Sequence, residues 1–262
     1  MSAANSAVLT QIYSLARRSV LRTLRQPAVM VSSLLFPMLL LAIQAGGLQP
    51  ATELPGFPAD SYLDFLFAFP LVQGALFAAT SAGTDLAKDI ETGFLSRLSL
   101  TPMRPVALLA GLLSGIVALG VIQGTVFLGV GLLAGIQLQS GWLGVPVLIL
   151  LTTTISLGFG AVGAIMALRT GSGESVQALF PLLFVGSFMS SIMLPRELIA
   201  TDWFRIVATI NPVSYLVEGI RSLVITGWDV PALALGFGVA IGITLVALLL
   251  SARSLRSRME RT

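Results

Sequence analysis

The sequence predicts an all-α, polytopic membrane protein with six transmembrane helices. Two observations on composition carry this prediction: 55% of the 262 residues are hydrophobic, and only 10% are charged. A soluble domain carries about 25% charged residues, so this chain has too few to cover a globular surface in water. The third observation is that the apolar residues gather in long runs with short polar connections between them. These runs lie at residues 28–46, 62–83, 105–134, 142–168, 175–195 and 230–252.

Each apolar run is long enough to cross a membrane as a helix. Hydrocarbon about 30 Å thick requires about 20 apolar residues, and a helix satisfies its own backbone within one segment. Residues 1–262 are therefore expected to form a single transmembrane domain. Pro37, Pro70 and Pro181 fall inside the runs, where proline kinks or locally unwinds a helix.

Glycines in the third run recur at GxxxG spacing, which allows a neighbouring helix to approach closely. The pairs are Gly111 and Gly115, Gly120 and Gly124, and Gly131 and Gly135. We expect tight helix packing along this run.

The basic residues predict the orientation of the chain. Of the 15 lysines and arginines, 12 lie in the two terminal segments and in the connections after the second and fourth runs. Cytoplasmic connections carry the excess of positive charge. Both termini are accordingly expected in the cytoplasm, as an even number of spans requires.

The segment before the first run, residues 1–27, predicts an amphipathic helix that lies in the cytoplasmic interface. One face holds Leu9, Ile12, Tyr13, Ala16, Val20 and Leu24, and the opposite face holds Arg18, Arg22 and Arg25. On such a helix the arginines meet lipid headgroups and the apolar face meets acyl chains. A cleavable signal peptide is the alternative, but the apolar run is long for one and begins late in the chain.

Several classes of chemistry are excluded by absent residue types. The chain has no cysteine and no histidine, so it can form no disulfide, thiolate nucleophile or histidine-liganded metal site. No GxxxxGK[ST] motif for binding nucleotide phosphates occurs. We expect a protein that is not an enzyme, with no cofactor or metal of its own and no nucleic-acid partner. An ion-coupled secondary transporter would need ionisable groups near the bilayer midplane, and the runs hold almost none.

The connection at residues 84–104 predicts a short amphipathic helix parallel to the membrane. Thr84 or Asp85 is a candidate N-cap, apolar residues recur every four positions from Leu86, and Gly93 is a candidate C-terminal break. Such a helix is suited to a groove on another protein. A solvated loop remains the alternative.

The segment at residues 196–229 predicts two short helices separated at Asn211 and Pro212. If they dip into the membrane and return, they would form a gate or seal on a translocation path. Amphipathic helices on the surface are the alternative. Glu218 and Arg221, three residues apart, are candidates to pair with each other.

The stretch DIETGFLSRLSLTPMRPVALLAGLL resembles the signature of the ABC type 2 permease family, the membrane subunits of daunorubicin-resistance-type exporters. The stretches RTGSGESVQALFPLLFVGSFMSSIMLP and WFRIVATINPVSYLVEGIRSL are similar to that family's fifth span and its extracellular re-entrant segment. At Asp202 the sequence departs from many relatives, which have proline there.

The resemblance implies that residues 84–104 contain a coupling helix that inserts into an ATPase subunit. Combined with the charged face of the predicted helix, it gives the coupling set Asp85, Lys88, Asp89, Glu91, Gly93, Leu95, Arg97 and Leu98. The candidates for gating or for the translocation path are Glu174, Gln177, Asn211, Pro212 and Tyr215.

The resemblance also implies the function: the permease subunit of an ATP-driven exporter in a prokaryotic plasma membrane. ATP and Mg would be bound by a separate ATPase, and a second copy of the permease or a paralogue would complete the path. The mostly apolar spans favour an amphipathic drug-like or lipidic substrate entering from the membrane. A lipid-linked polysaccharide exporter, an ion-coupled transporter and a membrane scaffold remain alternatives.

Overall fold

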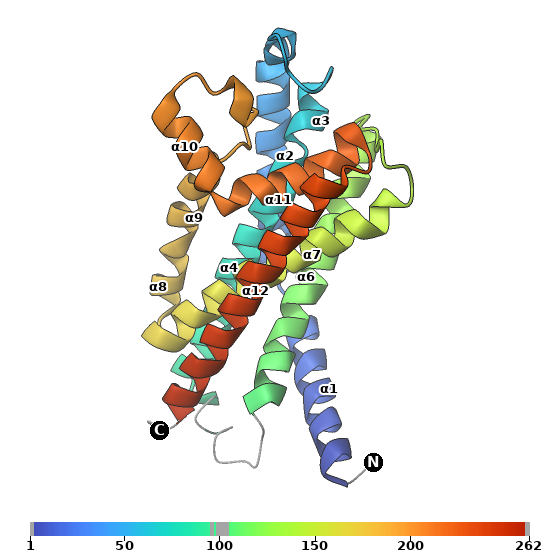
Figure 1. The fold of residues 1–262 in the computed structure, drawn as a ribbon. Helices are drawn as coiled ribbons and strands as arrows, with labels where there is room; N and C mark the ends of the chain where they lie inside the picture. Colours follow the sequence, from blue (N-terminus) through green and yellow to red (C-terminus); the bar gives the residue numbers. More distant parts are fainter. Residues whose placement is uncertain (1–2, 95–96, 98–104, 260–262) are drawn as a thin grey trace.

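The computed structural model describes residues 3–94, 97 and 105–259, and these residues form helices and connecting turns without a strand. The bundle is elongated (Figure 1). Its α-helices are α1 (Ala3–Leu24), α2 (Pro27–Leu48), α3 (Tyr62–Leu66), α4 (Ala68–Glu91), α6 (Pro105–Leu133), α7 (Gly144–Thr170), α8 (Gly173–Gln177), α9 (Leu179–Phe188), α10 (Asp202–Ile210), α11 (Pro212–Arg221) and α12 (Val230–Met259).

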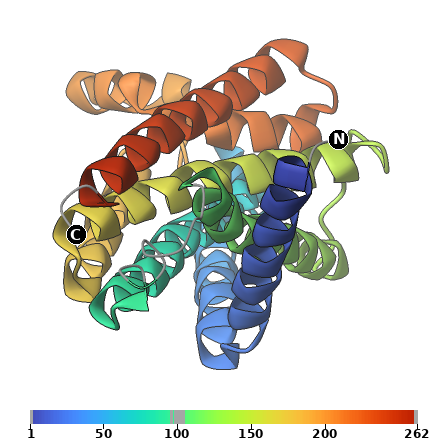
Figure 2. The same cartoon turned by 90° about the horizontal axis from the view of Figure 1, so that it is seen from below.

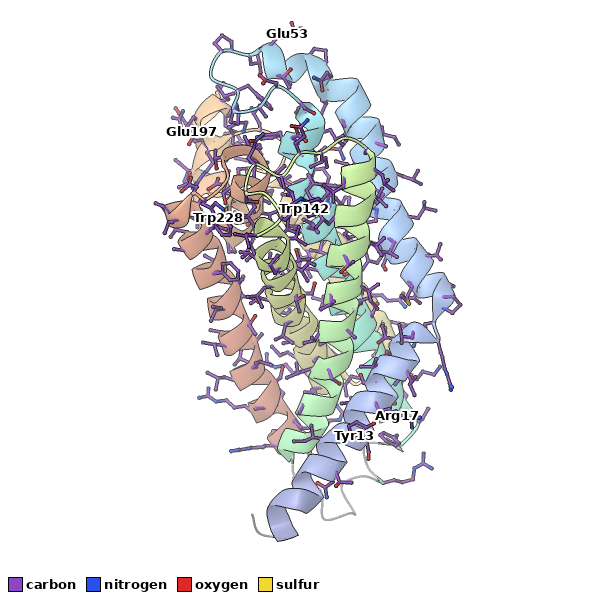
Figure 3. The ribbon with its side chains drawn as sticks, turned by 90° about the vertical axis from the view of Figure 1, so that its right-hand side faces the viewer. Tyr13, Arg17, Glu53, Trp142, Glu197 and Trp228 are labelled. Atoms are coloured by element: carbon purple, nitrogen blue, oxygen red, sulfur yellow. The ribbon has the colours of Figure 1, made fainter. Side chains whose placement is uncertain are left out.

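Both ends of the chain lie at the same end of the bundle, which we call the lower end, as drawn in Figure 1. The turn after α2 and helix α10 lie at the opposite, upper end. Figure 3 shows Tyr13 and Arg17 near the lower end and Glu53 at the upper end. Trp142 and Trp228 are exposed in the upper part, and exposed tryptophan is enriched where a membrane meets water.

Five helical segments are long and apolar enough to cross a membrane. Within the described residues these are Pro27–Glu53, Tyr62–Glu91, Leu113–Leu133, Gly144–Thr170 and Val230–Arg258. They coincide with five of the six predicted runs. The run at 175–195 does not form one long helix. It contains the consecutive helices α8 and α9, of 5 and 10 residues, which together extend only about 23 Å at about 1.5 Å per residue.

Proline accounts for the break between α8 and α9. Pro181 has no N–H to donate to the carbonyl of Gln177, and its ring crowds that carbonyl. Pro70 likewise has no N–H to donate to the carbonyl of Leu66, four residues earlier, and this missing hydrogen bond separates α3 from α4. The predicted local effect of these two prolines is confirmed, whereas Pro37 lies inside a continuous α2.

Helix α4 forms the centre of the bundle. In the span Tyr62–Glu91, most of which is α4, 83% of the most apolar stretch is buried. The corresponding share is 17% in the span that contains α2 and 28% in the span that contains α12. It packs on α7, α6, α2, α8 and α11. Seen from below, α1 and α2 lie on one side of the bundle and α12 lies on the other (Figure 2).

The continuity of α4 corrects one prediction. No separate helix begins at residue 84, because α4 runs without interruption to Glu91. The hydroxyl of Thr84 donates to the carbonyls of Thr80 and Ser81 inside the helix instead of capping a new one. The predicted break at Gly93 is confirmed, since its φ is 68°, a left-handed conformation that glycine adopts without steric cost. Residues 98–104 lie outside the described residues.

Gly111, Gly115 and Gly120 of α6 lie at close helix contacts, as predicted from their spacing, whereas a Cβ at Gly135 would meet no atom within 4 Å. A Cβ at Gly111 would be 2.4 Å from Leu15 Cβ, and one at Gly115 would be 2.3 Å from Ser19 Oγ. Helix α1 therefore packs directly against the glycine face of α6. Gly120 and Gly124 face α7 in the same way.

The predicted pair of short helices in residues 196–229 is confirmed as α10 and α11, which meet at Asn211. The predicted helix in residues 1–27 is confirmed as α1, and Pro27 is the first residue of α2. Pro27 is suited to that place because the first residues of a helix need no N–H donor.

Helices α4 and α7 approach most closely at Gly163. A Cβ at this position would be 1.8 Å from the backbone oxygen of Ala79, whereas one at Gly242 of α12 would meet no atom within 4 Å. We expect Gly163→Ala to destabilise the fold by about 1–3 kcal/mol, because backbone must shift to admit the methyl group. Gly242→Ala is the matched control and is expected to leave stability unchanged or slightly raised. Thermal unfolding of the two purified variants in detergent tests this, and equal midpoints would contradict the packing described.

Candidate functional site

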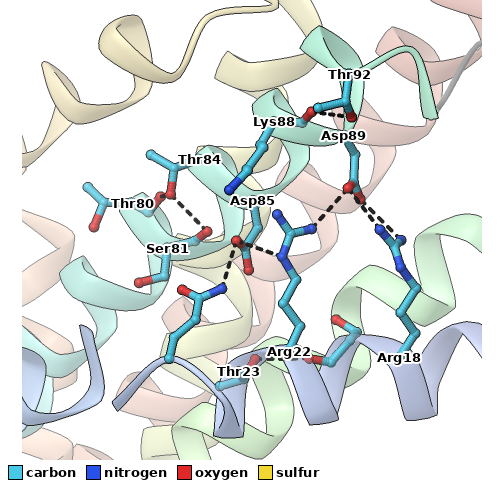
Figure 4. Close-up of polar contacts among 12 residues, drawn as sticks. Arg18, Arg22, Thr23, Thr80, Ser81, Thr84, Asp85, Lys88, Asp89 and Thr92 are labelled. Carbon is cyan, nitrogen blue, oxygen red and sulfur yellow. Dashed lines mark hydrogen bonds and ion pairs between the residues drawn. The ribbon is translucent and has the colours of Figure 1, made fainter. Parts of the chain in front are cut away.

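An ionic cluster joins α1 to the lower end of α4. Arg22 lies between two carboxylates, with Nε 3.0 Å from Asp85 Oδ1 and Nη1 3.0 Å from Asp89 Oδ1. Arg18 Nη2 lies 2.9 Å from Asp89 Oδ1, and its Nη1 donates to Oδ2 of the same carboxylate at 3.3 Å. Gln26 Nε2 donates to Asp85 Oδ1 at 3.2 Å. We call Arg18, Arg22, Gln26, Asp85 and Asp89 the lower cluster (Figure 4).

Helix periodicity explains why these four charged side chains meet. The two arginines are four residues apart on α1, and the two aspartates are four residues apart on α4, so each pair shares one helix face. The guanidinium fork of Arg18 matches the two oxygens of a carboxylate. The four side chains are 19% to 43% exposed, so water screens these pairs less than fully exposed ones.

The lower cluster corrects the predicted role of two arginines. Arg18 and Arg22 were expected to meet lipid headgroups, but their guanidinium groups face carboxylates of the protein. The face of α1 predicted to be apolar and to meet acyl chains is partly exposed, with Tyr13 and Leu24 outermost, which agrees with that part of the prediction. The arginine face is therefore the one that α1 turns toward α4.

Glu91 joins the end of α4 to the start of α8. Its Oε1 accepts a hydrogen bond from the backbone N–H of Gly173 at 3.2 Å. Just beyond α4, Arg97 donates to the backbone oxygens of Thr92 and Gly93 at 3.2 and 3.3 Å. The α4 terminus is thus linked to α1 on one side and to α8 on the other.

The predicted coupling residues divide into two groups. Asp85 and Asp89 turn inward to α1, while Lys88, Glu91 and Arg97 are exposed around the end of α4. Leu95 and Leu98 lie outside the described residues. Arg18, Arg22 and Gln26 were absent from the predicted set. The signal that could have identified the arginines is the matching four-residue spacing of two cations and two anions.

Asn211 organises the upper group of predicted residues. Its Oδ1 accepts from the backbone N–H of Val213 at 2.9 Å and so caps α11. Its Nδ2 donates to the carbonyls of Gly186 and Met189 at 2.8 and 3.0 Å. Pro212 occupies the first helical position, where no N–H is needed. The end of α9 is therefore held against the start of α11.

Tyr215 lies beside the same junction. Its hydroxyl donates to the carbonyl of Thr209 at 2.8 Å. Glu174 and Gln177 do not join this group, because they are exposed on α8, beyond the other end of α9. The structure therefore brings together Asn211, Pro212 and Tyr215 and leaves the other two predicted residues near the lower end.

Glu218 pairs with Arg196 instead of the predicted Arg221. Arg196 Nη2 donates to one oxygen of Glu218, and the hydroxyl of Ser191 donates to the other at 2.9 Å. Burial acts to lower the pKa of the Arg196 guanidinium, but the charge of Glu218 and the hydrogen bonds around it outweigh burial and raise that pKa. Sequence spacing gave no signal for this pair.

Arg221 is buried and binds backbone carbonyls. It donates to the carbonyl of Phe65 at 3.0 Å and to those of Ser191 and Ile192 at 3.2 Å. Its guanidinium also lies 3.5 Å from the centre of the Phe65 ring, a favourable cation–π contact. The residue thereby ties α11 to α3 and to the turn after α9.

A row of phenylalanines runs between α9, α4 and α2. Phe180, Phe184 and Phe188 are successive ring neighbours on α9, with centroids 5.6 and 4.9 Å apart. Phe77 of α4 lies 5.1 Å from Phe180, and Phe36 of α2 lies 6.3 Å from Phe184. We call these five residues the phenylalanine row. Their four-residue spacing on α9 is visible in the sequence.

No cluster of three or more acidic side chains suited to a metal ion occurs in the part of the chain that the structure describes. The polar groups described above form ion pairs, helix caps and hydrogen bonds to carbonyls. These contacts join helices to one another at both ends of the bundle.

The two roles of Asn211 can be separated by substitution. Asn211→Ser keeps a side-chain oxygen that can cap α11 but loses the amide that donates to α9, whereas Asn211→Ala loses both. We expect a loss of about 0.5–2 kcal/mol from the missing cap, so the alanine variant should unfold at the lower temperature. Thermal unfolding in detergent ranks wild type, Ser and Ala. An alanine variant as stable as wild type would show that the cap is unimportant.

Comparison with known proteins identifies the family of this chain. A family model described as ABC-2 type transporter matches residues 10–225. The chain is 31% identical over 232 residues to the daunorubicin resistance ABC transporter permease protein DrrB1 of Streptomyces coeruleorubidus, covering 83% of this chain and 75% of that protein. It is 26% identical over 223 residues to the putative transport permease ycf38 of Cyanophora paradoxa, covering 82% and 74% of the two chains. It is also 26% identical over 217 residues to the ycf38 permease of Porphyra purpurea, with the same coverage. The chain therefore belongs to the ABC-2 type transporter family, as a multi-pass membrane subunit of an ABC transporter.

Proposed function

We propose that this chain is the permease subunit of an ATP-driven exporter in a prokaryotic plasma membrane. A separate ATPase subunit binds ATP and Mg, and two permeases, identical or paralogous, enclose one path. The lower end faces the cytoplasm and the ATPase. The substrate is an amphipathic drug-like or lipidic molecule.

The observation that carries this proposal is the set of contacts around the lower end of α4. Asp85 and Asp89 hold α1, and Glu91 holds the first residue of α8. Lys88, Glu91 and Arg97 are exposed at the same place and form the docking surface for the ATPase. A displacement of the lower end of α4 therefore acts on α1, α4 and α8 together.

Helix α4 is suited to carry that displacement into the membrane. Protein interiors are close-packed and compress little, and α4 is the most buried of the five candidate spans. Gly83 of α4 lies against the backbone of Gly163 in α7, and Gly163 in turn lies against the backbone of Ala79 in α4. Movement of the end of α4 is therefore transmitted to α7 and not absorbed by loose side chains.

A second route leads from α8 to the upper end. Helices α8 and α9 rise from the lower end toward α10 (Figure 1), and we assign this broken pair as the sixth crossing. Asn211 then links the end of α9 to α11. In this mechanism α10 and α11 are re-entrant helices that seal the extracellular side, and Asn211, Pro212 and Tyr215 set the seal. Glu174 and Gln177 lie where the cytoplasmic side of this route begins.

The phenylalanine row supports an amphipathic or lipidic substrate. Its five rings offer apolar area and no hydrogen-bonding groups, which suits the apolar part of such a molecule. A drug-like substrate also fits the drug-resistance name of the Streptomyces relative. The ionisable residues of the five candidate spans lie near their ends, which disfavours coupling to an ion at the midplane.

Retention of the ATPase tests the docking surface. We expect wild-type chain to co-purify with its ATPase in constant ratio, and the double variant Glu91→Arg with Arg97→Glu to lose most of it. Both reversals change the charge at the proposed contact. Glu53→Arg is the matched control, because Glu53 is exposed at the upper end and should leave retention unchanged.

The opposite outcome of this experiment is equally informative. If no ATPase is retained by wild type, or if the double variant retains it fully, the coupling assignment fails. A membrane scaffold or an ion-coupled transporter would then be the better-supported function.

A further inference from the structure

A set of buried polar side chains without hydrogen-bond partners lies on α6 and α7. Among the residues that the structure describes, seven buried side-chain oxygen or nitrogen atoms have no partner. Five of these atoms belong to Gln123 of α6 and to Thr152, Thr153 and Ser156 of α7. We call these four residues the unpaired set. Gln123, Thr152 and Ser156 are fully buried, and Gln123 is the central residue of the candidate span Leu113–Leu133.

Two glycines of α6 bring its backbone against this part of α7. A Cβ at Gly120 would be 3.0 Å from Ser156 Cβ and 3.1 Å from Thr153 Cα. A Cβ at Gly124 would be 3.6 Å from Thr152 Cβ. The hydroxyl-bearing residues of α7 therefore face the glycine side of α6, which offers their hydroxyl groups no side-chain partner.

The amide of Gln123 points toward α4 instead of α7. A Cβ at Gly74 of α4 would be 3.0 Å from Gln123 Oε1, so the amide lies over a residue that has no side chain. Gln123 directly precedes Gly124, which faces Thr152. The amide has two N–H donors and one carbonyl acceptor, and each hydroxyl of α7 can both donate and accept. The two sides of the contact are chemically complementary but do not meet.

Hydroxyl groups at the contact of α7 with α12 are paired. Ser251 of α12 donates to the carbonyl of Ala161 at 3.2 Å, and Thr244 donates to the carbonyl of Thr154 at 3.1 Å. Most buried polar groups in proteins are paired in this way, and an unpaired group is least favourable where water cannot reach it. The contact of α6 with α7 is therefore less favourable here than one in which the same groups bond to each other.

We infer that α6 and α7 have a second relative position, in which the amide of Gln123 bonds to the hydroxyls of the unpaired set. Reaching it requires α6 to turn or slide by less than one helical turn. Helices α4 and α7 are in backbone contact at Gly163 and move together, so α6 is the neighbour against which they shift. Sliding of packed helices is a known form of conformational change. Only the assignment of the second position to the ATP-bound state rests on the proposed function.

A distance between α6 and α7 tests for the second position without the ATPase. Val130→Cys and Leu150→Cys place spin labels at exposed sites on the two helices, and the labelled chain is diluted in unlabelled chain. A Cβ at Gly120 crowds the present position, whereas one at Gly129 of the same helix meets no atom within 4 Å. In double electron–electron resonance, Gly120→Ala should move the distance to a second defined value, and Gly129→Ala should keep the wild-type value. An unchanged or only broadened distance in Gly120→Ala would overturn the proposal.

Gln123→Met separates hydrogen bonding from packing, because methionine is similar in length and has no amide. Added to Gly120→Ala, it should abolish the second distance, since the second position then lacks the hydrogen bonds that stabilise it. A second distance that persists in the double variant would overturn the role of Gln123.

Thermal unfolding of the purified chain in detergent tests whether the set is unpaired in the present position. Gln123→Met and Ser156→Ala should leave the midpoint unchanged or raise it, because neither removes a hydrogen bond. Ser251→Ala is the matched control, because it removes a buried hydroxyl that is paired, and it should lower the midpoint. An equal decrease in all three variants would show that water already pairs the set and would overturn the proposal.

The same labels separate this inference from the proposed function. With ATPase and ATP, the wild-type distance should move to the value that Gly120→Ala gives. If Gly120→Ala gives the second value but the chain retains no ATPase, the two positions stand and the proposed function fails. If the ATPase is retained and hydrolyses ATP, but neither ATP nor Gly120→Ala gives a second value, the proposed function stands and this inference fails.

Discussion

The arrangement of the lower end depends on one guanidinium, that of Arg22, held between Asp85 and Asp89. This contact decides which face of α1 turns inward. An exposed ion pair contributes only about 0–1 kcal/mol, but here Arg18 and Gln26 join the same two carboxylates in a half-buried network. The small residues that face α1 on α6 then allow the helices to pack closely, as at Gly111 and Leu15. The ion pairs with Asp85 and Asp89 determine which face of α1 turns inward, and the glycines of α6 determine how closely α1 packs on α6.

From the lower cluster, direct contacts connect α4 to the rest of the bundle. Helix α4 is bound to α1 by charge, to α7 by backbone contact at Gly163 and to α8 by Glu91. Pro181 interrupts the path between α8 and α9 without ending it, and Asn211 connects α9 to α11. Along this path from α4 to α11, the helices are joined by direct contacts, and the helix is interrupted once, at Pro181. A transporter needs such an arrangement, because two states require elements that move as units about a few joints.

Much of the fold could be predicted because the length of an apolar run reports directly on membrane crossing. Local preferences were less reliable. Thr84 and Asp85 are good N-caps, yet an unbroken helix from Ala68 gives the Thr84 hydroxyl a nearer acceptor at Thr80. Glu218 and Arg221 have the spacing of an ion pair, but Glu218 finds Arg196, 22 residues away. The lower cluster joins residues up to 71 apart, and spacing within each helix cannot show which helices meet.

Coupling through the lower cluster requires that α1 and the lower end of α4 move as one body, and a distance between these two elements tests that requirement. The chain has no cysteine, so Tyr13→Cys with Thr92→Cys places spin labels at two exposed sites only. With the labelled chain diluted in an excess of unlabelled chain, so that a pair of permeases carries one labelled copy, double electron–electron resonance should give one narrow distance that is the same without ATPase, with ATPase, and with ATPase and ATP. Asp85→Asn with Asp89→Asn in the same background should broaden it. A distance that shifts or splits when ATP binds, while the lower cluster is intact, would show that α1 and α4 move independently.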